Sequence, residues 1–96
     1  MTYIWVDDVR NPTIPEAIWC CNYKSAIETI ERYKNDTIIL CLDHDLGEEK
    51  TGYDICKYII ENSIPISLIQ IHSANPVGRA NMNQLLTHYG YNVVMI

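Results

Sequence analysis

The chain has 96 residues, 48% of them hydrophobic, and a formal charge of -5 at pH 7. This length fits one domain over residues 1–96, and the composition is that of a globular protein. The negative charge and the lack of a basic run argue against binding to duplex DNA, which needs a positive surface. No basic leader opens the sequence, and no apolar stretch approaches the ~20 residues of a membrane span. The four cysteines form no C-x-x-C pair, so we expect reduced thiols and a cytoplasmic setting.

The first half of the sequence predicts three strands and one helix. Tyr3–Val6 is a short apolar strand, and the loop Val9–Glu16 leads to a second strand at Ala17–Cys21. Apolar residues recur at helical spacing through Asn22–Lys34, and the apolar run Ile38–Leu42 is typical of a central parallel strand. Because the loop is short for a parallel crossover, the direction of the second strand stays open.

The second half predicts helix, strand, helix and strand. A helix opens at Thr51 with a capping-box pattern, and a strand follows at Leu68–Ile71. The next helix starts at Asn75, which precedes a proline, and Gly90 ends it before the last strand at Asn92–Ile96. The order β-β-α-β-α-β-α-β predicts an α/β fold with a mostly parallel five-stranded sheet.

Polar side chains gather where three of these strands end. In parallel sheets, ligands bind at the carboxyl ends of the strands, so these residues are the candidate site. They are Asp7-Asp8-Val9-Arg10, Asp43-His44-Asp45 and His72-Ser73-Ala74-Asn75.

The acidic residues at these ends indicate a metal site. Crowded carboxylates repel one another unless a cation lies between them, and hard oxygen ligands suit Mg²⁺ or another divalent cation. The candidate ligands are Asp7, Asp8, Asp43 and Asp45. The alternative is a solvated acidic rim without a metal, in which the neighbouring histidines offset the charge.

Two histidines indicate acid–base chemistry. His44 and His72 follow strands that we expect to be neighbours, and imidazole titrates near neutrality, so the pair could act as general base and general acid. Asp43 would hold the metal or orient a histidine. The alternative is that one histidine only packs or orients a loop.

An anion-binding group is also expected near the last helix. The helix after Asn75 directs free N–H groups and its positive dipole end toward the sheet edge, and Ser73 lies beside it. Arg79 and Arg10 could reach the same anion. The alternative is ordinary capping by Asn75 and a surface Arg79.

Other conspicuous residues have simpler interpretations. Glu48–Lys50 is expected to be a solvated loop. Trp5 and Trp19 are expected in the core or an interface, with the stacking of a nucleobase as the alternative.

The order of the motifs resembles a receiver domain of two-component signalling. Receivers carry an acidic pair after the first strand, a phosphoacceptor Asp after the third and Ser or Thr after the fourth, and Asp43 and Ser73 match the last two. The receiver lysine has no counterpart in the terminal NVVMI. The first receiver helix is replaced by Val9–Glu16, and the last is missing because the chain stops at Ile96.

Three longer motifs are similar to those of a narrower group, the cyclic-phosphate processing receiver-like domain family. They are D-D-x-R-x-P from Asp7, L-D-H-D-L-G from Leu42 and I-H-S-A-N-P-V-G-R from Ile71. This resemblance implies binding and hydrolysis of a cyclic nucleotide or of an RNA 2′,3′-cyclic phosphate end by a phosphodiesterase-like hydrolase. The alternatives are a non-catalytic binder or sponge for such a ligand and a phospho-accepting receiver with Asp43 as nucleophile.

The missing helices predict a bare sheet face. In a receiver the first and last helices cover the same face, so the remaining helices would lie mainly on the other face. The strands are apolar on both sides, and a soluble monomer seldom exposes so much apolar surface. We therefore expect a homodimer through the helix-free face, with covering by Val9–Glu16 and the tryptophans as the alternative.

Overall fold

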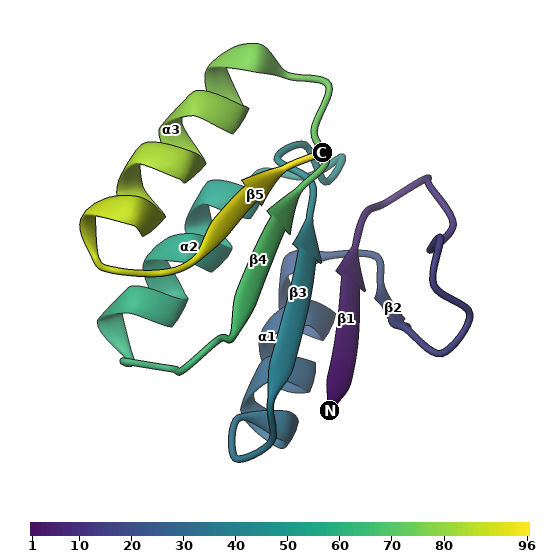
Figure 1. Ribbon diagram of the computed structural model, residues 1–96. Coiled ribbons are helices and arrows are strands. Elements are labelled where there is room, and N and C mark those ends of the chain that lie inside the picture. The colour runs from purple at the N-terminus through teal and green to yellow at the C-terminus, as the bar shows by residue number, and fades with distance from the viewer.

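The computed structural model describes residues 1–96 and contains a five-stranded sheet with three helices (Figure 1). The strands are β1 (Thr2–Val6), β2 (Ile18–Cys20), β3 (Ile38–Leu42), β4 (Leu68–Ile71) and β5 (Val93–Met95). The helices are α1 (Tyr23–Tyr33), α2 (Gly52–Glu61) and α3 (Pro76–His88). The predicted order of elements is confirmed, and the bounds differ by a residue or two at several ends.

Every strand pairing is parallel, and the strand order is β2-β1-β3-β4-β5. This is the receiver-like, flavodoxin-like order that we expected. The open question about β2 is settled, because Trp19 pairs with Trp5 in parallel register. The linking segment makes this crossover without a helix, since an extended chain of that length can span one short strand.

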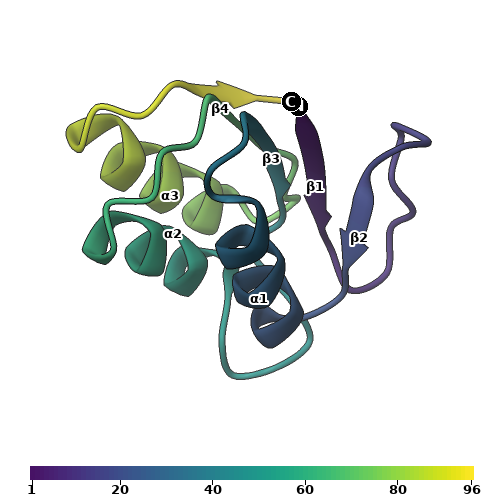
Figure 2. The same cartoon turned by 90° about the horizontal axis from the view of Figure 1, so that it is seen from below.

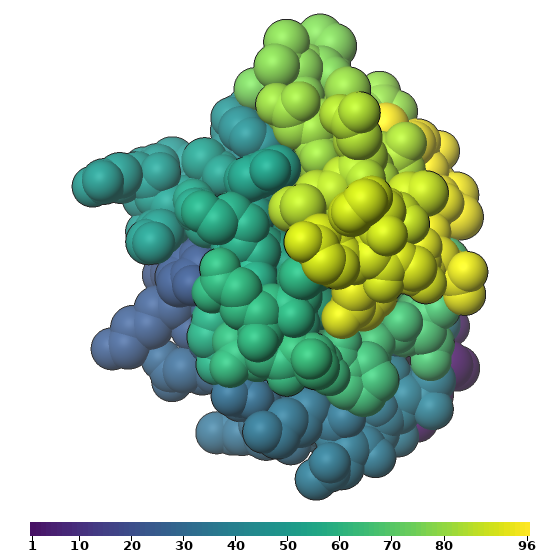
Figure 3. All heavy atoms as spheres, turned by 90° about the vertical axis from the view of Figure 1, so that its left-hand side faces the viewer, coloured from purple at the N-terminus to yellow at the C-terminus, as the bar shows by residue number.

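All three helices lie on one face of the sheet (Figure 2). Their inner residues pack with the strand residues that point the same way, among them Ile4, Leu40 and Ile69, which are fully buried. Helices α2 and α3 lie side by side over this face (Figure 3). None of the helices has the length and apolar character that a membrane crossing requires.

The opposite face has no helix, as the sequence predicted (Figure 2). Trp5 and Cys41 on this face are nevertheless only 4% and 2% exposed. The segment after β1 covers Trp5, whose indole N–H donates to the Arg10 carbonyl at 2.9 Å. Trp19 and Val94 remain 41% and 44% exposed. The loop therefore covers part of the face, and the homodimer stays a prediction.

Local sequence explains where the helices begin. The Asn22 side chain accepts from the Ser25 amide at 2.8 Å, and Asn75 accepts from the Gly78 amide at 3.0 Å. Asp54 accepts from the Thr51 amide at 2.8 Å, which confirms the capping interaction predicted there. The caps at Thr51 and Asn75 anchor the ends of the loops that follow β3 and β4.

Candidate functional site

The register of the sheet places three strand-end residues in one row. Val6 pairs with Leu42, and Leu42 pairs with Ile71. The next residues along β1, β3 and β4 are Asp7, Asp43 and His72. Side chains alternate along a strand, so all three are directed toward the helix-free side of the edge, like Trp5 two residues earlier.

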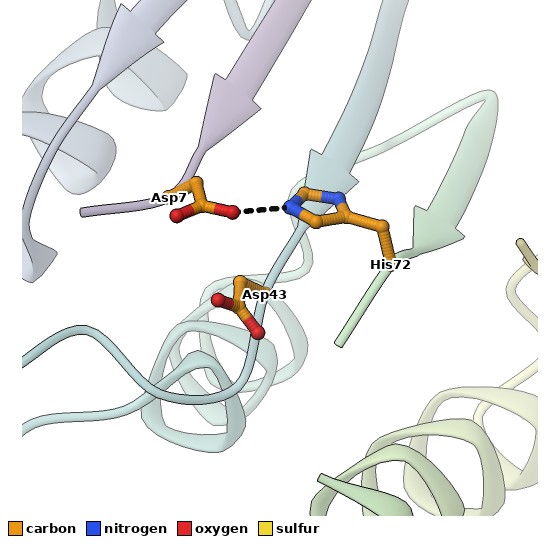
Figure 4. A group of neighbouring side chains, drawn as sticks. All are labelled: Asp7, Asp43 and His72. Carbon is orange, nitrogen blue, oxygen red and sulfur yellow. Dashed lines mark hydrogen bonds and ion pairs between the residues drawn. The ribbon is translucent and has the colours of Figure 1, made fainter. Parts of the chain in front are cut away.

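Asp7 and His72 form a buried pair across the end of β3 (Figure 4). The His72 Nε2 atom lies 3.0 Å from Asp7 Oδ2, and the exposed fractions of the two side chains are 5% and 0%. Burial by itself raises the pKa of the Asp7 carboxyl. Hydrogen bonds from the Arg10 and Val9 amides and from His72 outweigh burial, so this pKa lies below its usual range.

Because Asp7 is ionised, its contact with His72 shows which ring nitrogen of the histidine carries a proton. A carboxylate only accepts hydrogen bonds, so Nε2 carries the proton that is donated to Asp7. The other ring nitrogen, Nδ1, is buried without a hydrogen-bond partner. Trp5 stacks on the ring with 4.3 Å between centroids and 10° between planes.

Asp43 completes the cluster in this row. One ligand atom from each of Asp7, Asp43 and His72 lies within 4.8 Å of the others. Oδ1 of Asp43 accepts from the His44 amide at 2.7 Å, which holds the carboxylate at the strand end. This receiver-type cluster could hold a divalent cation.

The donor set decides which ion would suit this cluster. Two carboxylates suit Mg²⁺ or Mn²⁺, whereas an imidazole nitrogen suits softer ions such as Zn²⁺. His72 could ligate an ion through Nε2 only by giving up the hydrogen bond to Asp7. The contacts therefore fit an ion held by the oxygen atoms of Asp7 and Asp43.

The other two predicted metal ligands lie outside the cluster. The Asp8 side chain lies against Gly47, where a β-carbon would come within 2.8 Å of Oδ2. Gly47 has φ +67°, so both its backbone and the space around it favour glycine. Asp45 is exposed, and its carboxylate accepts a hydrogen bond from the His44 ring.

His44 belongs to a second Asp–His pair, which is formed through the other ring nitrogen. Its Nδ1 lies 2.9 Å from Asp45 Oδ1, and the His44 ring holds the pKa of the Asp45 carboxyl below its usual range. Nδ1 therefore carries a proton, and Nε2 forms no hydrogen bond within the chain. The side-chain NH₂ group of Asn75 donates to both carboxylate oxygens of Asp45 at 3.4 Å, which is a long hydrogen bond. The ring packs on Gly78, where a β-carbon would overlap it.

The two histidines thus have different surroundings. His72 stands in line with Asp43, whereas His44 is one residue further along its strand end. Successive side chains point to opposite sides of a sheet, which directs His44 toward α3 and His72 toward β1. Sequence reasoning grouped them as one pair, and no hydrogen bond joins them.

The expected anion-binding residues lie around the start of α3. Ser73 is buried, and its Oγ accepts from the Asn75 amide at 3.1 Å. Arg79 forms no ion pair, and its Nε is buried without a partner. Arg10 reaches the edge from the β1–β2 segment and donates from Nη1 to the His72 carbonyl at 3.1 Å.

The loop after β3 is less free than the sequence suggested. Glu48, Glu49 and Lys50 are exposed, as expected. The Glu48 carboxylate nevertheless accepts from the Tyr23 amide at 2.7 Å, and the Lys50 ammonium lies 5.2 Å from the Tyr23 ring centroid. An acidic side chain is favourable at the start of a helix, so this contact ties the loop to α1.

The family comparison covers most of the chain. The model of the cyclic-phosphate processing receiver domain family matches residues 2–88. The chain belongs to this family. Among curated proteins and solved structures, nothing matches the chain. The resemblance found in the sequence motifs is thereby confirmed.

In this cyclic-phosphate processing receiver domain, the largest hollow lies away from the cluster. It has a volume of about 730 Å³ and opens at the opposite edge of the sheet. It is lined mainly by Lys34–Thr37, Ser63–Ser67 and Tyr89–Asn92. These segments bring neither a histidine nor a cluster of carboxylates, so size alone does not identify the site.

Trp5 is the site residue that sequence reasoning missed. Its strand is apolar on both faces, so the tryptophan was assigned to the core or an interface. The missed signal was its position two residues before Asp7, on the same side of β1. Period-two alternation then places it beneath the carboxylate.

Proposed function

We propose that this domain binds a cyclic phosphate at the C-terminal edge of its sheet and hydrolyses it. The observation that carries the proposal is the buried Asp7–His72 pair beside Asp43. A histidine oriented by a carboxylate, next to a candidate cation site, is the kind of group that acid–base catalysis uses. The family's name supplies the class of substrate.

Hydrolysis of a cyclic phosphate needs one group to activate water and another to protonate the leaving oxygen. His44 and His72 can divide this work when one ring is neutral and takes a proton from water, while the other is an imidazolium whose N–H gives a proton to the leaving oxygen. His44 leaves Nε2 free and its side chain is 19% exposed, so a ligand meets this ring first. Asp45 is then a positioning residue for His44. His72 is 5% exposed, so its part in the reaction requires some opening of the site.

The phosphate would lie between the start of α3 and the segment after β1. Free amide groups and the helix dipole favour an anion there. Arg79 has an unpartnered Nε, and Arg10 has guanidinium N–H groups beyond the one bonded to His72. Ser73 and Asn75 would complete the phosphate contacts with hydroxyl and amide groups.

A divalent cation, with Mg²⁺ as the first choice, would be held by Asp7 and Asp43. It would neutralise charge on the phosphate oxygens and help to orient the attacking water. Asp8 could join only by leaving its position against Gly47. The residues of the chain would still supply the proton transfers and the contacts that orient the ligand.

A second candidate is a binder that holds the cyclic phosphate without cleaving it. The burial of His72 favours this candidate, because Nδ1 is enclosed and makes no contact with solvent or a partner. A group in that position can stabilise a pocket without exchanging protons with a ligand. The two candidates predict the same ligand class and differ in whether the ligand is recovered intact.

Mass spectrometry after incubation with a panel of cyclic phosphates separates the two candidates. The panel contains cyclic mono-, di- and oligonucleotides and RNA with 2′,3′-cyclic ends, each with Mg²⁺, Mn²⁺ or EDTA. For hydrolysis we expect a ring-opened product, with turnover lowered roughly 10²–10⁴-fold by His72→Ala or His44→Ala. His88→Ala, at the exposed end of α3, is the matched control.

One outcome would count against hydrolysis and another against the role of His72. Saturable binding of one ligand that is recovered unchanged would establish the binder instead. Turnover that persists in His72→Ala would remove this residue from the reaction. Loss of binding in Arg79→Ala without unfolding is expected for both candidates.

A further inference from the structure

Trp5 is buried on a face that no helix covers. Its exposed fraction is 4%, whereas its neighbour in the sheet, Trp19, is 41% exposed. The His72 ring covers one part of Trp5, and the segment after β1 holds its edge through the bond from the indole N–H to the Arg10 carbonyl. The tryptophan is therefore enclosed by residues of the site and not by the main core, to which it does not belong.

Two contacts define the orientation of the His72 ring. Parallel stacking on Trp5 at 4.3 Å and 10° fixes the plane of the ring. The hydrogen bond to Asp7 at 3.0 Å then fixes which edge of the ring faces the cluster. Without the stack, the ring could rotate about its side-chain bonds while Asp7 kept its bonds to the Val9 and Arg10 amides.

Arg10 connects the residues of this arrangement. Its amide donates to Asp7 Oδ1 at 2.9 Å, and its carbonyl accepts from the Trp5 indole at 2.9 Å. Its guanidinium donates to the His72 carbonyl at 3.1 Å. Asp7, Arg10, Trp5 and His72 thus form a closed ring of contacts that joins β1 to β4 across the end of β3.

We propose that Trp5 is the positioning residue of His72, which it holds by ring stacking in the orientation that donates Nε2–H to Asp7. Trp5 does not touch the ligand in this role; it acts through the imidazole. Its catalytic consequence rests on the proposed function. The orientation of the ring is a property of the protein alone and can be measured without substrate.

The test uses the ¹⁵N-labelled 96-residue chain and three variants. Imidazole ¹⁵N shifts report which ring nitrogen of His72 carries the proton, and turnover is measured in parallel on the cyclic phosphate that the panel identifies. Trp5→Leu removes the stacking partner. Trp5→Phe keeps one aromatic ring for stacking but loses the N–H donor to Arg10 and the second ring of the indole. Tyr3→Leu, on the same face of the same strand, is the control.

We expect the Nε2–H tautomer of His72 in the wild type, in Trp5→Phe and in Tyr3→Leu. Trp5→Leu should show a mixture of tautomers and a loss of turnover of roughly tenfold or more, since misplacement of a reacting group can cost ~10²-fold. An unchanged tautomer in folded Trp5→Leu would overturn the proposal. A mixture of tautomers in Trp5→Phe as large as in Trp5→Leu would also overturn stacking as the cause.

A failure of hydrolysis and a failure of the positioning role give different results. If the wild type turns over no ligand of the panel, hydrolysis fails, and the tautomer measurement alone decides the role of Trp5. If Trp5→Leu unfolds, Trp5→Met, which also lacks an aromatic ring, is measured in its place. A wild type with the Nδ1–H tautomer would refute the positioning role whatever the activity.

Discussion

Replacing Asp7 by Asn tests the buried pair directly. Asp7 accepts three hydrogen bonds, from the Val9 and Arg10 amides and from His72 Nε2. Asn can keep the two amide bonds through its oxygen, but its NH₂ group then faces the His72 N–H. The histidine must move its proton to Nδ1 or lose the contact, and Nδ1 is buried without an acceptor.

The cost of this substitution can be worked from these contacts. A buried donor left without a partner costs about 1–3 kcal/mol, and hydrogen bonds to a charged group are roughly twice as strong as neutral ones. We therefore expect Asp7→Asn to lower the free energy of unfolding by about 2–4 kcal/mol at pH 7. For a domain of this size, each kcal/mol corresponds to a shift of roughly 4–8 °C in the melting temperature.

The pH dependence has a defined sign. The pKa of Asp7 in the folded protein lies below the ordinary value of 3.8, so its contribution to stability is complete above that value. The contribution is lost as the pH falls through the lower folded pKa. The difference between wild type and Asp7→Asn should therefore be present at pH 5 and above and shrink near pH 3.

Urea unfolding at pH 7, 5 and 3 measures this difference. Asp8→Asn is the matched control, because Asp8 makes no hydrogen bond or ion pair within the chain, and a change within about 0.5 kcal/mol is expected. Equal stability of Asp7→Asn and wild type at pH 7 would refute the buried pair. A difference that grows toward pH 3 would refute the lowered pKa.

Three further predictions concern packing, capping and association. Gly78→Ala should destabilise the domain by about 1–3 kcal/mol in urea unfolding, because the added carbon overlaps the His44 ring; raised stability would contradict that position. Glu48→Ala should cost about 0.5–2 kcal/mol in thermal unfolding, because the Tyr23 amide loses its acceptor, while Glu48→Gln should lose less. Sedimentation of the wild type at micromolar concentration should give the mass of two chains, and Val94→Asp on the helix-free face should give one; a monomeric wild type would remove the homodimer.

Sequence alone determined the elements and the edge at which the site lies. The apolar run of β3, the Asn75 cap and the stop at Gly90 are local signals, because capping and backbone angles depend on a few neighbouring residues. The alternation of strands and helices then implied a parallel sheet. Parallel strands end at one edge, so the convergence of Asp7, Asp43 and His72 followed from their positions after strands.

Only the tertiary structure decided which side chains meet. Asp7 and His72 are separated by 65 residues and by one intervening strand, and their contact depends on a register that spans β1, β3 and β4. A shift of that register by one residue would direct His72 to the other side of the sheet, as His44 is. The stacking of Trp5 on His72 depends on the same register, because no local pattern specifies a partner on a distant strand.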